Sequence, residues 1–320
     1  MSGSPSPLRV AVVGAGHLGQ HHARLYADLP GCQLIAVVDT DLGRAEEVAS
    51  RHGGEAMDDA RRLEGRVDAV SVAVPTESHR DVAAPFLEQG IAVLVEKPMA
   101  ATLEEADALL ALSRRTGAVL GVGHTERFNP AVEALAQRAS DPRFIEAHRL
   151  GSFAPRSLDI DVVLDLMIHD IDITLDLVGS PILSVEAIGV AALTGRADIA
   201  NARLVFATGC VANLTASRIS ATRTRKIRLF QRDAYLSCDC AERSLEHYWL
   251  DRTATGAPPR IVREPVAVEP EEPLRRELAS FAAAARGEAS FPVPGEAGRA
   301  ALAAALEVAH RIRASSGDLS

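Results

Sequence analysis

A glycine-rich turn near the start of the chain constrains the fold more than any other feature. In "LRVAVVGAGHLGQHH", Gly14, Gly16 and Gly19 stand between an apolar run typical of a buried strand and the start of a helical pattern. In such a unit the first glycine permits a tight turn, the second lets the backbone approach a pyrophosphate, and the third lets the helix pack closely on the strand. The pattern predicts a dinucleotide-binding site; the alternative is that the glycines only shape a turn.

The first 123 residues repeat this alternation of strand and helix. Apolar runs typical of buried parallel strands are separated by helical patterns. The predicted strands cover residues 8–14, 33–39, 67–75, 91–98 and 118–124, and the predicted helices cover 18–29, 42–52, 78–89 and 102–116. This alternation predicts an α/β fold whose N-terminal domain, residues 1–124, is a Rossmann-type doubly wound parallel sheet.

The pattern changes after residues 126–130, and most of the predicted elements that follow are consecutive strands. A helix near 130–139, a strand at 144–150 and a helix at 162–179 precede strands at 182–190, 199–207, 210–218, 224–231 and 234–240, with a short strand at 261–268 and helices at 273–286 and 295–312. Thr208 and Gly209 mark a hairpin turn. Residues 125–320 are therefore predicted to form an α+β domain with a large, predominantly antiparallel open sheet, whose closing helices are free to pack on the first domain.

Composition excludes several classes of function. A chain of 320 residues with a net charge of −9 is long enough for two domains and has no broad attraction to nucleic acid or anionic membranes. No apolar run approaches the ~20 residues of a membrane span, and the N-terminus lacks a signal-peptide pattern. We therefore expect a cytoplasmic protein with a short leader. The four cysteines, Cys32, Cys210, Cys238 and Cys240, are interpreted as reduced packing residues rather than zinc ligands.

The end of the second predicted strand indicates which dinucleotide is bound. Asp39 follows Gly19 by twenty residues, where a carboxylate can accept hydrogen bonds from both ribose hydroxyls. The same carboxylate would repel a 2′-phosphate, which favours NAD over NADP. Arg44 lies close enough in sequence to keep NADP possible.

Polar residues at strand ends are candidates for the chemistry. In an open α/β sheet the ligand crevice lies beyond the carboxyl ends of the strands, where Glu96, Lys97 and Pro98 follow one predicted strand. The ammonium of Lys97 could bind a substrate hydroxyl and stabilise the charge that develops as hydride leaves; the alternative is a surface Lys paired with Glu96. His124 ends the last strand of this domain and has the best position among the other histidines for the same crevice. His79, early in a helix, is equally compatible with cofactor contact and with packing.

The predicted helix 162–179 carries a polar strip within an apolar surface. On a helix of 3.6 residues per turn, Asp165, His169, Asp172 and Asp176 fall within a sector of roughly 60°. Asp165 and His169 are one turn apart, so the carboxylate can orient the imidazole as a general base. The alternatives are a core histidine satisfied by Asp165, or a metal pair with Asp172.

Four motifs resemble, in their order along the chain, those of the Gfo/Idh/MocA oxidoreductases: "GAGHLGQHH", "VPTESH", "VEKPMA" and "DLMIHD". The resemblance covers essentially the whole chain. It implies a Rossmann domain followed by a sheet domain that also makes subunit contacts, with Lys97, Asp165 and His169 in the catalytic positions. It implies cofactor contacts from the glycine turn and Asp39 together with His17, Leu18, Pro75, Thr76, His79, Glu96 and Lys97.

Within this family, "GVGHTERFNPAV" and "DIANARLVFATGCVANLTASR" are most similar to the branch that oxidises the 3-hydroxyl of UDP-N-acetylglucosamine for 3-amino-sugar (lipid A) synthesis. A nucleotide-sugar substrate requires donors for its diphosphate. Arg156 and Arg218 are candidates; they are equally compatible with strand-face charges or subunit contacts. The resemblance places Lys97, Asp165 and His169 at the sugar, and the position of His124 at the crevice makes it a further candidate.

Three other functions stay open. The chain could oxidise a free polyol or sugar of the inositol or glucose type, act as an NAD-dependent glycoside hydrolase, or serve as a nucleotide-binding regulator. The regulator is disfavoured because a sensor needs neither Lys97 nor His169. An open sheet must cover its other side, so we expect a homodimer or homotetramer.

Overall fold

The computed structural model describes residues 6–153, 160–252 and 260–317. The chain divides into two compact units, one of residues 1–125 and 272–299 and the other of residues 126–271 and 300–320. It therefore passes from one unit to the other after Thr125, after Glu271 and after Arg299. The predicted boundary at 124/125 lies next to the first of these crossings. Residues 272–299, which contain the predicted helix 273–286, belong to the first unit, as the prediction allowed for the closing helices.

The first unit contains a sheet of six parallel strands in the order β3-β2-β1-β4-β5-β6. The strands are β1 Leu8–Val13, β2 Cys32–Val38, β3 Glu55–Met57, β4 Ala69–Val72, β5 Ala92–Glu96 and β6 Leu120–Gly123. The strand order reverses direction between β1 and β4, which is where open α/β sheets bind ligands. The short strand β3 was not predicted, because three residues are too few to show a period.

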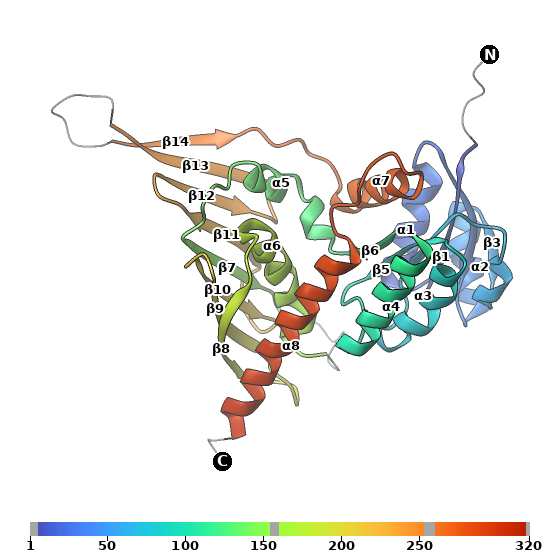
Figure 1. Ribbon diagram of the computed structural model, residues 1–320, viewed down its shortest axis with the longest axis horizontal. Coiled ribbons are helices and arrows are strands. Elements are labelled where there is room, and N and C mark those ends of the chain that lie inside the picture. The colour runs from blue at the N-terminus through green and yellow to red at the C-terminus, as the bar shows by residue number, and fades with distance from the viewer. Residues whose placement is uncertain (1–5, 154–159, 253–259, 318–320) are drawn as a thin grey trace. The chain divides into compact units, whose positions relative to one another are not determined.

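Helices cover both faces of this sheet, as the alternating pattern predicted (Figure 1). They are α1 His17–Asp28, α2 Leu42–His52, α3 His79–Glu88, α4 Leu103–Thr116 and α7 Pro273–Ala285, with short 3₁₀ turns η1 Ala60–Leu63 and η2 Thr76–Ser78. Side chains cap two of the helices, since Asp41 accepts from Arg44 N and Thr102 accepts from Glu105 N. The late helix α7 packs against α1.

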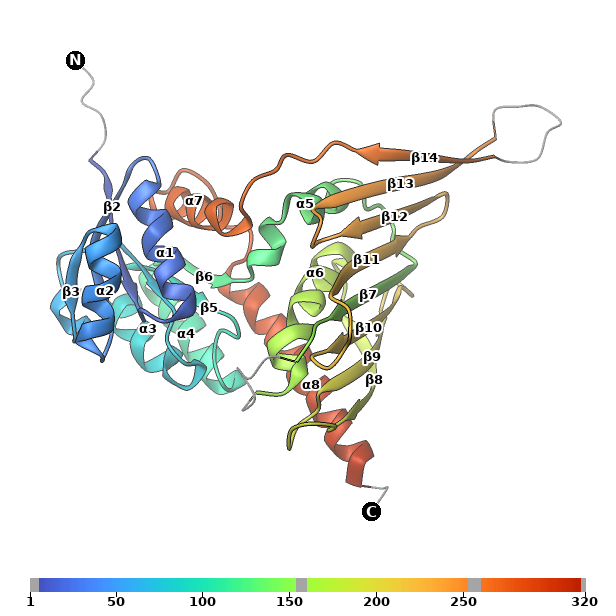
Figure 2. The same cartoon turned by 180° about the vertical axis from the view of Figure 1, so that it is seen from behind.

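The second unit contains an eight-stranded sheet in the order β14-β13-β12-β11-β7-β10-β9-β8 (Figure 2). The strands are β7 Phe144–Leu150, β8 Ile182–Val190, β9 Ile199–Phe206, β10 Val211–Ser217, β11 Thr224–Phe230, β12 Ala234–Asp239, β13 Ser244–Asp251 and β14 Arg260–Val266. All neighbouring pairs are antiparallel except β7 with β10. Strand β13 was not predicted; of its residues only Leu245 is fully buried, so its sequence lacks a clear apolar alternation.

One face of this sheet is packed and the other is partly open. Helices α5 Pro130–Ala136 and α6 Ile168–Val178 and the later part of α8 Gly295–Gly317 share a core with the inward-facing strand residues. On the opposite face Phe144, Phe230, Tyr235 and Tyr248 form an aromatic row, with successive ring centroids 5.7, 4.7 and 5.0 Å apart. Within the described ranges, no helix has the length and apolar composition that a membrane span requires.

The predicted helix 162–179 is not one regular α-helix. Val163–Met167 form a π-helical stretch, η4, and α6 begins at Ile168. Asp161 begins this stretch by accepting a hydrogen bond from Val163 N at 2.7 Å. The spacing of 3.6 residues per turn therefore does not hold between Asp165 and His169. Single π-turns within helices frequently occur at functional sites.

Candidate active site

A cleft of about 710 Å³ lies at the carboxyl ends of β1, β2 and β4 in the first unit. The glycine turn forms part of its wall, and Asp39 at the end of β2 forms another part. The remaining wall comes from the segments after β3 and β4, including Asp58, Asp59, Val74, Pro75 and Ser78. The cleft is thus located where the strand order reverses, as expected of a dinucleotide site.

The glycine turn is shaped by backbone contacts. Gly14 has a φ of +100°, and a Cβ atom at this position would lie 2.4 Å from the carbonyl oxygen of Ala73. A Cβ at Gly19 would lie 1.7 Å from the carbonyl oxygen of Gly14, whereas one at Gly16 would meet nothing within 4 Å. No side chain caps the start of α1, so its first amide groups are available to an anion. The turn therefore fits the pyrophosphate of NAD.

Asp39 is fixed by the backbone around it. Its Oδ2 accepts a hydrogen bond from Ala15 N at 2.8 Å, and its Oδ1 accepts one from Asp41 N at 3.0 Å. A carboxylate oxygen can accept more than one hydrogen bond, so both oxygens can still receive ribose hydroxyls. Arg44 Nη1 lies 3.5 Å from Oδ2 and also belongs to the wall of the cleft.

The predicted cofactor residues fall into two groups. Those that line the cleft are Gly14, Gly16, Leu18, Asp39 and Pro75. The others are not part of this lining: His17, Gly19, Thr76, His79, Glu96 and Lys97. Two members of the second group, Glu96 and His79, make contacts that hold the segment around Lys97.

The residue before Lys97 is paired inside the protein. Glu96 is 6% exposed, and its Oε1 lies 3.0 Å from Nε2 of the buried His22. Its Oε2 accepts a hydrogen bond from the backbone nitrogen of Lys97 at 3.3 Å. Burial opposes ionisation of Glu96, yet His22 and then Lys97 keep its pKa below the ordinary value. The Glu96 carboxylate is thus part of the support of Lys97, which the surface-pair alternative did not anticipate.

The residue after Lys97 is held by His79. The imidazole of His79 has Nδ1 2.9 Å from the carbonyl oxygen of Pro98 and Nε2 2.9 Å from the carbonyl oxygen of Val74. Burial lowers the pKa of this imidazole, which favours the neutral ring, and a neutral ring donates through one nitrogen only. His79 thus lies between the segment after β5 and the wall of the cleft after β4, and in its neutral form it donates to one of the two carbonyl oxygens.

In the second unit, Asp165 lies in η4 and His169 is the second residue of α6, both partly buried. Asp172 and Asp176, further along α6, belong to the predicted polar strip but pair with an arginine. Arg127 approaches Asp172 at 3.4 Å and Asp176 at 2.6 Å, and burial raises the pKa of Asp172 to about 7. No group of three or more potential metal-binding side chains occurs in the part of the chain that is described.

The remaining substrate candidates differ in what holds them. His124 is buried just after β6. The guanidinium of Arg218 donates to the carbonyl oxygen of Ile160 at 2.5 Å and lies 3.8 Å from Asp198, so it supports the segment before η4. Its binding to a diphosphate stays a prediction. Arg156 lies outside the described residues.

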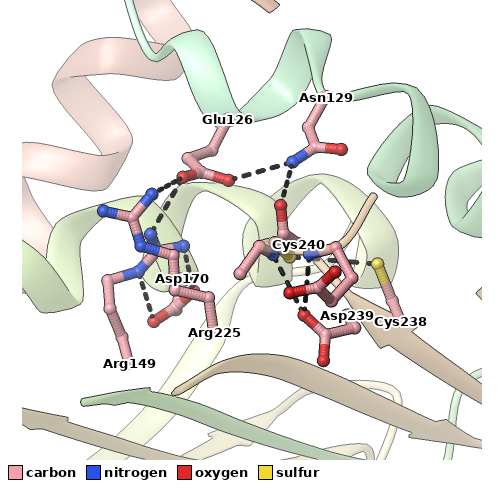
Figure 3. Close-up of polar contacts among 10 residues, drawn as sticks. Glu126, Asn129, Arg149, Asp170, Arg225, Cys238, Asp239 and Cys240 are labelled. Atoms are coloured by element: carbon pink, nitrogen blue, oxygen red, sulfur yellow. Dashed lines mark hydrogen bonds and ion pairs between the residues drawn. The ribbon is translucent and has the colours of Figure 1, made fainter. Parts of the chain in front are cut away.

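An ion network that the sequence did not predict is formed by Glu126, Arg149, Asp170 and Arg225 (Figure 3). Its Asp170 follows His169 directly in the chain. A signal was present in "FIEAHRL", where alternation places Arg149 on the same face as the apolar Ile145 and Ala147. A charge on the core face of a strand requires a buried partner of opposite charge. The sequence alone does not say which carboxylate provides it.

Comparison with family models gives two matches. Residues 8–124 match the oxidoreductase family with an NAD-binding Rossmann fold, GFO_IDH_MocA, and residues 133–236 match the GFO/IDH/MocA C-terminal domain. The two matches together cover the whole first sheet and the second sheet from β7 to the start of β12.

Individual relatives extend this likeness over nearly the full length. The chain is 41% identical over 302 residues to UDP-N-acetylglucosamine 3-dehydrogenase of Acidithiobacillus ferrooxidans, covering 94% of this chain and 96% of that protein. A solved structure of that protein, GnnA, superposes with a TM-score of 0.91, covering 96% and 98% of the two chains at 40% identity. The scyllo-inositol 2-dehydrogenase (NAD(+)) of Bacillus subtilis is 34% identical over 233 residues, 67% of this chain and 68% of that protein.

Proposed function

Because the chain belongs to the Gfo/Idh/MocA family of NAD-binding oxidoreductases, we propose that it oxidises the 3-hydroxyl of UDP-N-acetylglucosamine. One observation carries the choice of substrate: the likeness to a UDP-N-acetylglucosamine 3-dehydrogenase extends through the second unit at 41% identity over 94% of the chain. The reaction would supply a 3-keto nucleotide sugar, the precursor expected for a 3-amino sugar.

The reaction removes a proton from the hydroxyl oxygen and a hydride from C3 of the sugar. The glycine turn and Asp39 would hold NAD, which would supply the hydride acceptor. We assign Lys97 and His169 to the proton. Lys97 shares the handling of this proton with His169, and its ammonium stabilises the negative charge that develops on the reacting oxygen. His169 accepts or relays the proton, and Asp165 orients the imidazole. His124 and Arg218 are assigned to the sugar and its diphosphate; Arg156 completes the proposed set.

The use of basic residues supports a proton role for Lys97. The chain has 34 lysines and arginines, of which only Lys97 and Lys226 are lysines. An arginine keeps its proton in proteins, whereas a lysine can release it when its surroundings favour the neutral form. A chain that otherwise uses arginine almost throughout thus keeps a lysine where proton transfer is needed.

The test is NADH formation by the purified protein with a panel of sugars. We expect turnover with UDP-N-acetylglucosamine and competition by UDP. Lys97→Arg, which retains the charge, should lower kcat by about 10²–10⁴-fold, the range of a lost acid–base group. Lys226→Arg is the matched control, because Lys226 is half exposed and lies 3.4 Å from Asp239 at the sheet surface. Turnover of free inositol or glucose with no reaction of any UDP-sugar would contradict the proposal.

A second candidate is oxidation of a free polyol. It is favoured by the 34% identity to scyllo-inositol 2-dehydrogenase over 67% of the chain. A polyol site needs no diphosphate contacts. Under this function inositol would be oxidised and UDP would not compete with it.

We propose a homodimer or homotetramer as the working assembly. The aromatic row leaves Phe144, Phe230, Tyr235 and Tyr248 partly exposed on one face of the second sheet, and an apolar surface of this kind is usually covered by a partner. Light scattering of the purified protein measures the assembly; a monomer at micromolar concentration would contradict it.

The free cysteines suit a reducing compartment, so we place the reaction in the cytoplasm.

A further inference from the structure

The ion network beside His169 consists of two arginines and two carboxylates on the inner face of the second sheet (Figure 3). Arg149 on β7 is 3% exposed and donates two hydrogen bonds to Asp170, from Nη2 at 2.8 Å and from Nε at 3.0 Å. Its Nη1 donates to Glu126 at 3.1 Å. Arg225 is the neighbour of Arg149 across the β7/β11 ladder and donates to the same Glu126 oxygen at 3.2 Å. Every charge in this network therefore has a partner of opposite sign.

Asn129 makes the further polar contacts of this network. Asn129 donates to the carbonyl oxygen of Cys240 at 2.9 Å and approaches Glu126 Oε2 at 3.4 Å. Burial works against the charge of Glu126, but Arg149 and Arg225 hold its pKa below the ordinary value. Burial also works against the charge of Arg149, but Asp170 and Glu126 raise its pKa. Burial raises the pKa of Asp170, and Arg149 works against this rise. The two hydrogen bonds from the Arg149 guanidinium to Asp170 favour the ionised carboxylate in this pair.

Asp170 follows His169 on α6, so a contact that fixes the backbone position of Asp170 also fixes that of His169. Successive residues of an α-helix are turned by about 100° and shifted by about 1.5 Å. Two hydrogen bonds from a planar guanidinium restrict both the rotation of α6 about its axis and its translation along that axis. We infer that Arg149 and Asp170 are positioning residues that set the direction of the His169 imidazole; this rests on the proposed function, in which His169 handles the proton.

The π-helical stretch before α6 explains why this restriction is needed. In a continuous α-helix the direction of His169 would follow from the apolar residues one and two turns earlier. The wider turn of Val163–Met167 interrupts that regular phase immediately before Ile168. The rotation of α6 about its axis must therefore be fixed by contacts within α6 itself. Asp170, which directly follows His169, provides such a contact through its hydrogen bonds to Arg149 on the sheet.

The chemical nature of the network supports position rather than stability. A buried ion pair contributes little net stability, and replacing both partners by apolar residues of similar size is often neutral or stabilising. Directional bonds, in contrast, define one geometry where apolar packing tolerates several. Arg149 and Asp170 can therefore be replaced together without leaving an unpaired charge, because Glu126 keeps Arg225.

The experiment compares Arg149→Met/Asp170→Leu with wild type, each with and without His169→Ala. With NAD and UDP-N-acetylglucosamine, we expect the apolar pair to lower kcat by about 100-fold, as a misplaced catalytic group does, while the NAD dissociation constant changes by less than about twofold. Since the pair acts through His169, adding His169→Ala to Arg149→Met/Asp170→Leu should lower kcat much less than adding it to wild type. A purely structural role would change the thermal midpoint and leave the two His169→Ala costs equal.

The matched control is Arg9→Met/Asp68→Leu in the first unit, which removes a similar pair of side-chain hydrogen bonds, at 2.7 and 3.1 Å. Arg9 lies at the start of β1, whereas the glycine turn follows the end of that strand. The kcat of this control should stay within about twofold of wild type. Should the apolar pair not fold, Arg149→Lys keeps the charge with fewer bonds and should lower kcat by about tenfold. An unchanged kcat in a folded variant overturns the positioning role alone. A wild type that oxidises no sugar or polyol, or whose kcat survives His169→Ala, overturns the proposed function and this role together.

Discussion

The two units hold their functional residues by different physical means. In the first unit the cleft is shaped by main-chain geometry: the glycine turn lies against backbone atoms, Asp39 is held by two backbone amides, and His79 contacts two carbonyl oxygens. In the second unit His169 lies beside a network of ionised side chains. The first arrangement joins mostly neighbours in sequence or adjacent strand ends. The second joins residues 21 to 99 positions apart.

This difference determines how each site should respond to change. A site held by backbone atoms tolerates little extra volume, because a main-chain atom cannot adopt another rotamer. A site held by ionised side chains responds to charge, partner and pH. The four predictions below test this contrast, beginning with the largest effect.

Gly19→Ala should cause the largest loss in the first unit. The added methyl group would lie 1.7 Å from the Gly14 carbonyl oxygen, so the turn has to move. Overpacking of this kind costs about 1–3 kcal/mol, and the upper end corresponds to about a 100-fold rise in the NAD dissociation constant. Gly43→Ala is the control, because a Cβ there would approach only Asp41 Oδ1, at 3.4 Å. Titration with NADH fluorescence measures both; unchanged binding in Gly19→Ala would contradict the backbone argument.

Asp39→Ser should reduce affinity for NAD by about 10–100-fold, since a charge-assisted hydrogen bond is worth about 1.5–3 kcal/mol. The repulsion of a 2′-phosphate is lost in the same variant, and Arg44, 3.5 Å from the Asp39 carboxylate, becomes able to face that phosphate. We therefore expect measurable turnover with NADP. Adding Arg44→Ala should abolish this gain; if NADP turnover persisted without Arg44, the assignment of both residues to the ribose would fail.

His79→Leu should reduce kcat and NAD affinity each by about tenfold, because it frees the segments around Pro98 and Val74 and leaves their carbonyl groups without the imidazole. The thermal midpoint should fall as well. His310→Leu, at an exposed position of α8, provides the comparison. Wild-type kinetics in a folded His79→Leu variant would show that the contact is not needed to hold Lys97.

Asp172→Asn should produce the smallest effect, and one that depends on pH. The pKa of Asp172 is raised from 3.8 to about 7 in the folded protein, mainly by burial. The folded state thus keeps a proton that the unfolded chain releases, so this group's contribution to stability is fully present below pH ~4 and is lost as pH rises towards 7. Asn does not titrate. The thermal midpoint of Asp172→Asn relative to wild type should therefore rise between pH 5 and pH 8.

The size of this effect follows from the pKa shift: each unit corresponds to about 1.4 kcal/mol. Loss of the contact with Arg127 offsets part of it, although Arg127 keeps Asp176 at 2.6 Å. An offset between the two melting curves that is the same at both pH values would contradict a protonated Asp172.

Much of the fold could be predicted because it follows from local patterns of apolar and polar residues along the chain. The strand predicted at 182–190 coincides with β8, and the order of strands and helices in the first unit follows from alternation alone. Strand β3 was missed because it is short, and β13 because partial burial removes the apolar alternation. The π-helical stretch was missed because its residues are as apolar as those of an α-helix.

The candidate site divides in the same way. The positions of Gly14, Gly16 and Asp39 follow from spacing along one βαβ unit, so a sequence pattern can identify them. The partner of Arg149 depends on which helix residue the sheet meets, and Asp165, Asp170 and Asp172 are all available within one helical segment. Only the three-dimensional structure identifies Asp170.

The contact between position 19 and the Gly14 carbonyl has a consequence for genetics. Space lost to a bulky side chain can be regained by trimming another side chain, but space lost against the main chain cannot. Selection for restored growth in a strain that depends on a Gly19 variant should therefore return reversion of the original codon, with few or no compensating mutations elsewhere in the gene. We therefore expect that almost no sequence change elsewhere in the protein can compensate for a larger residue at position 19.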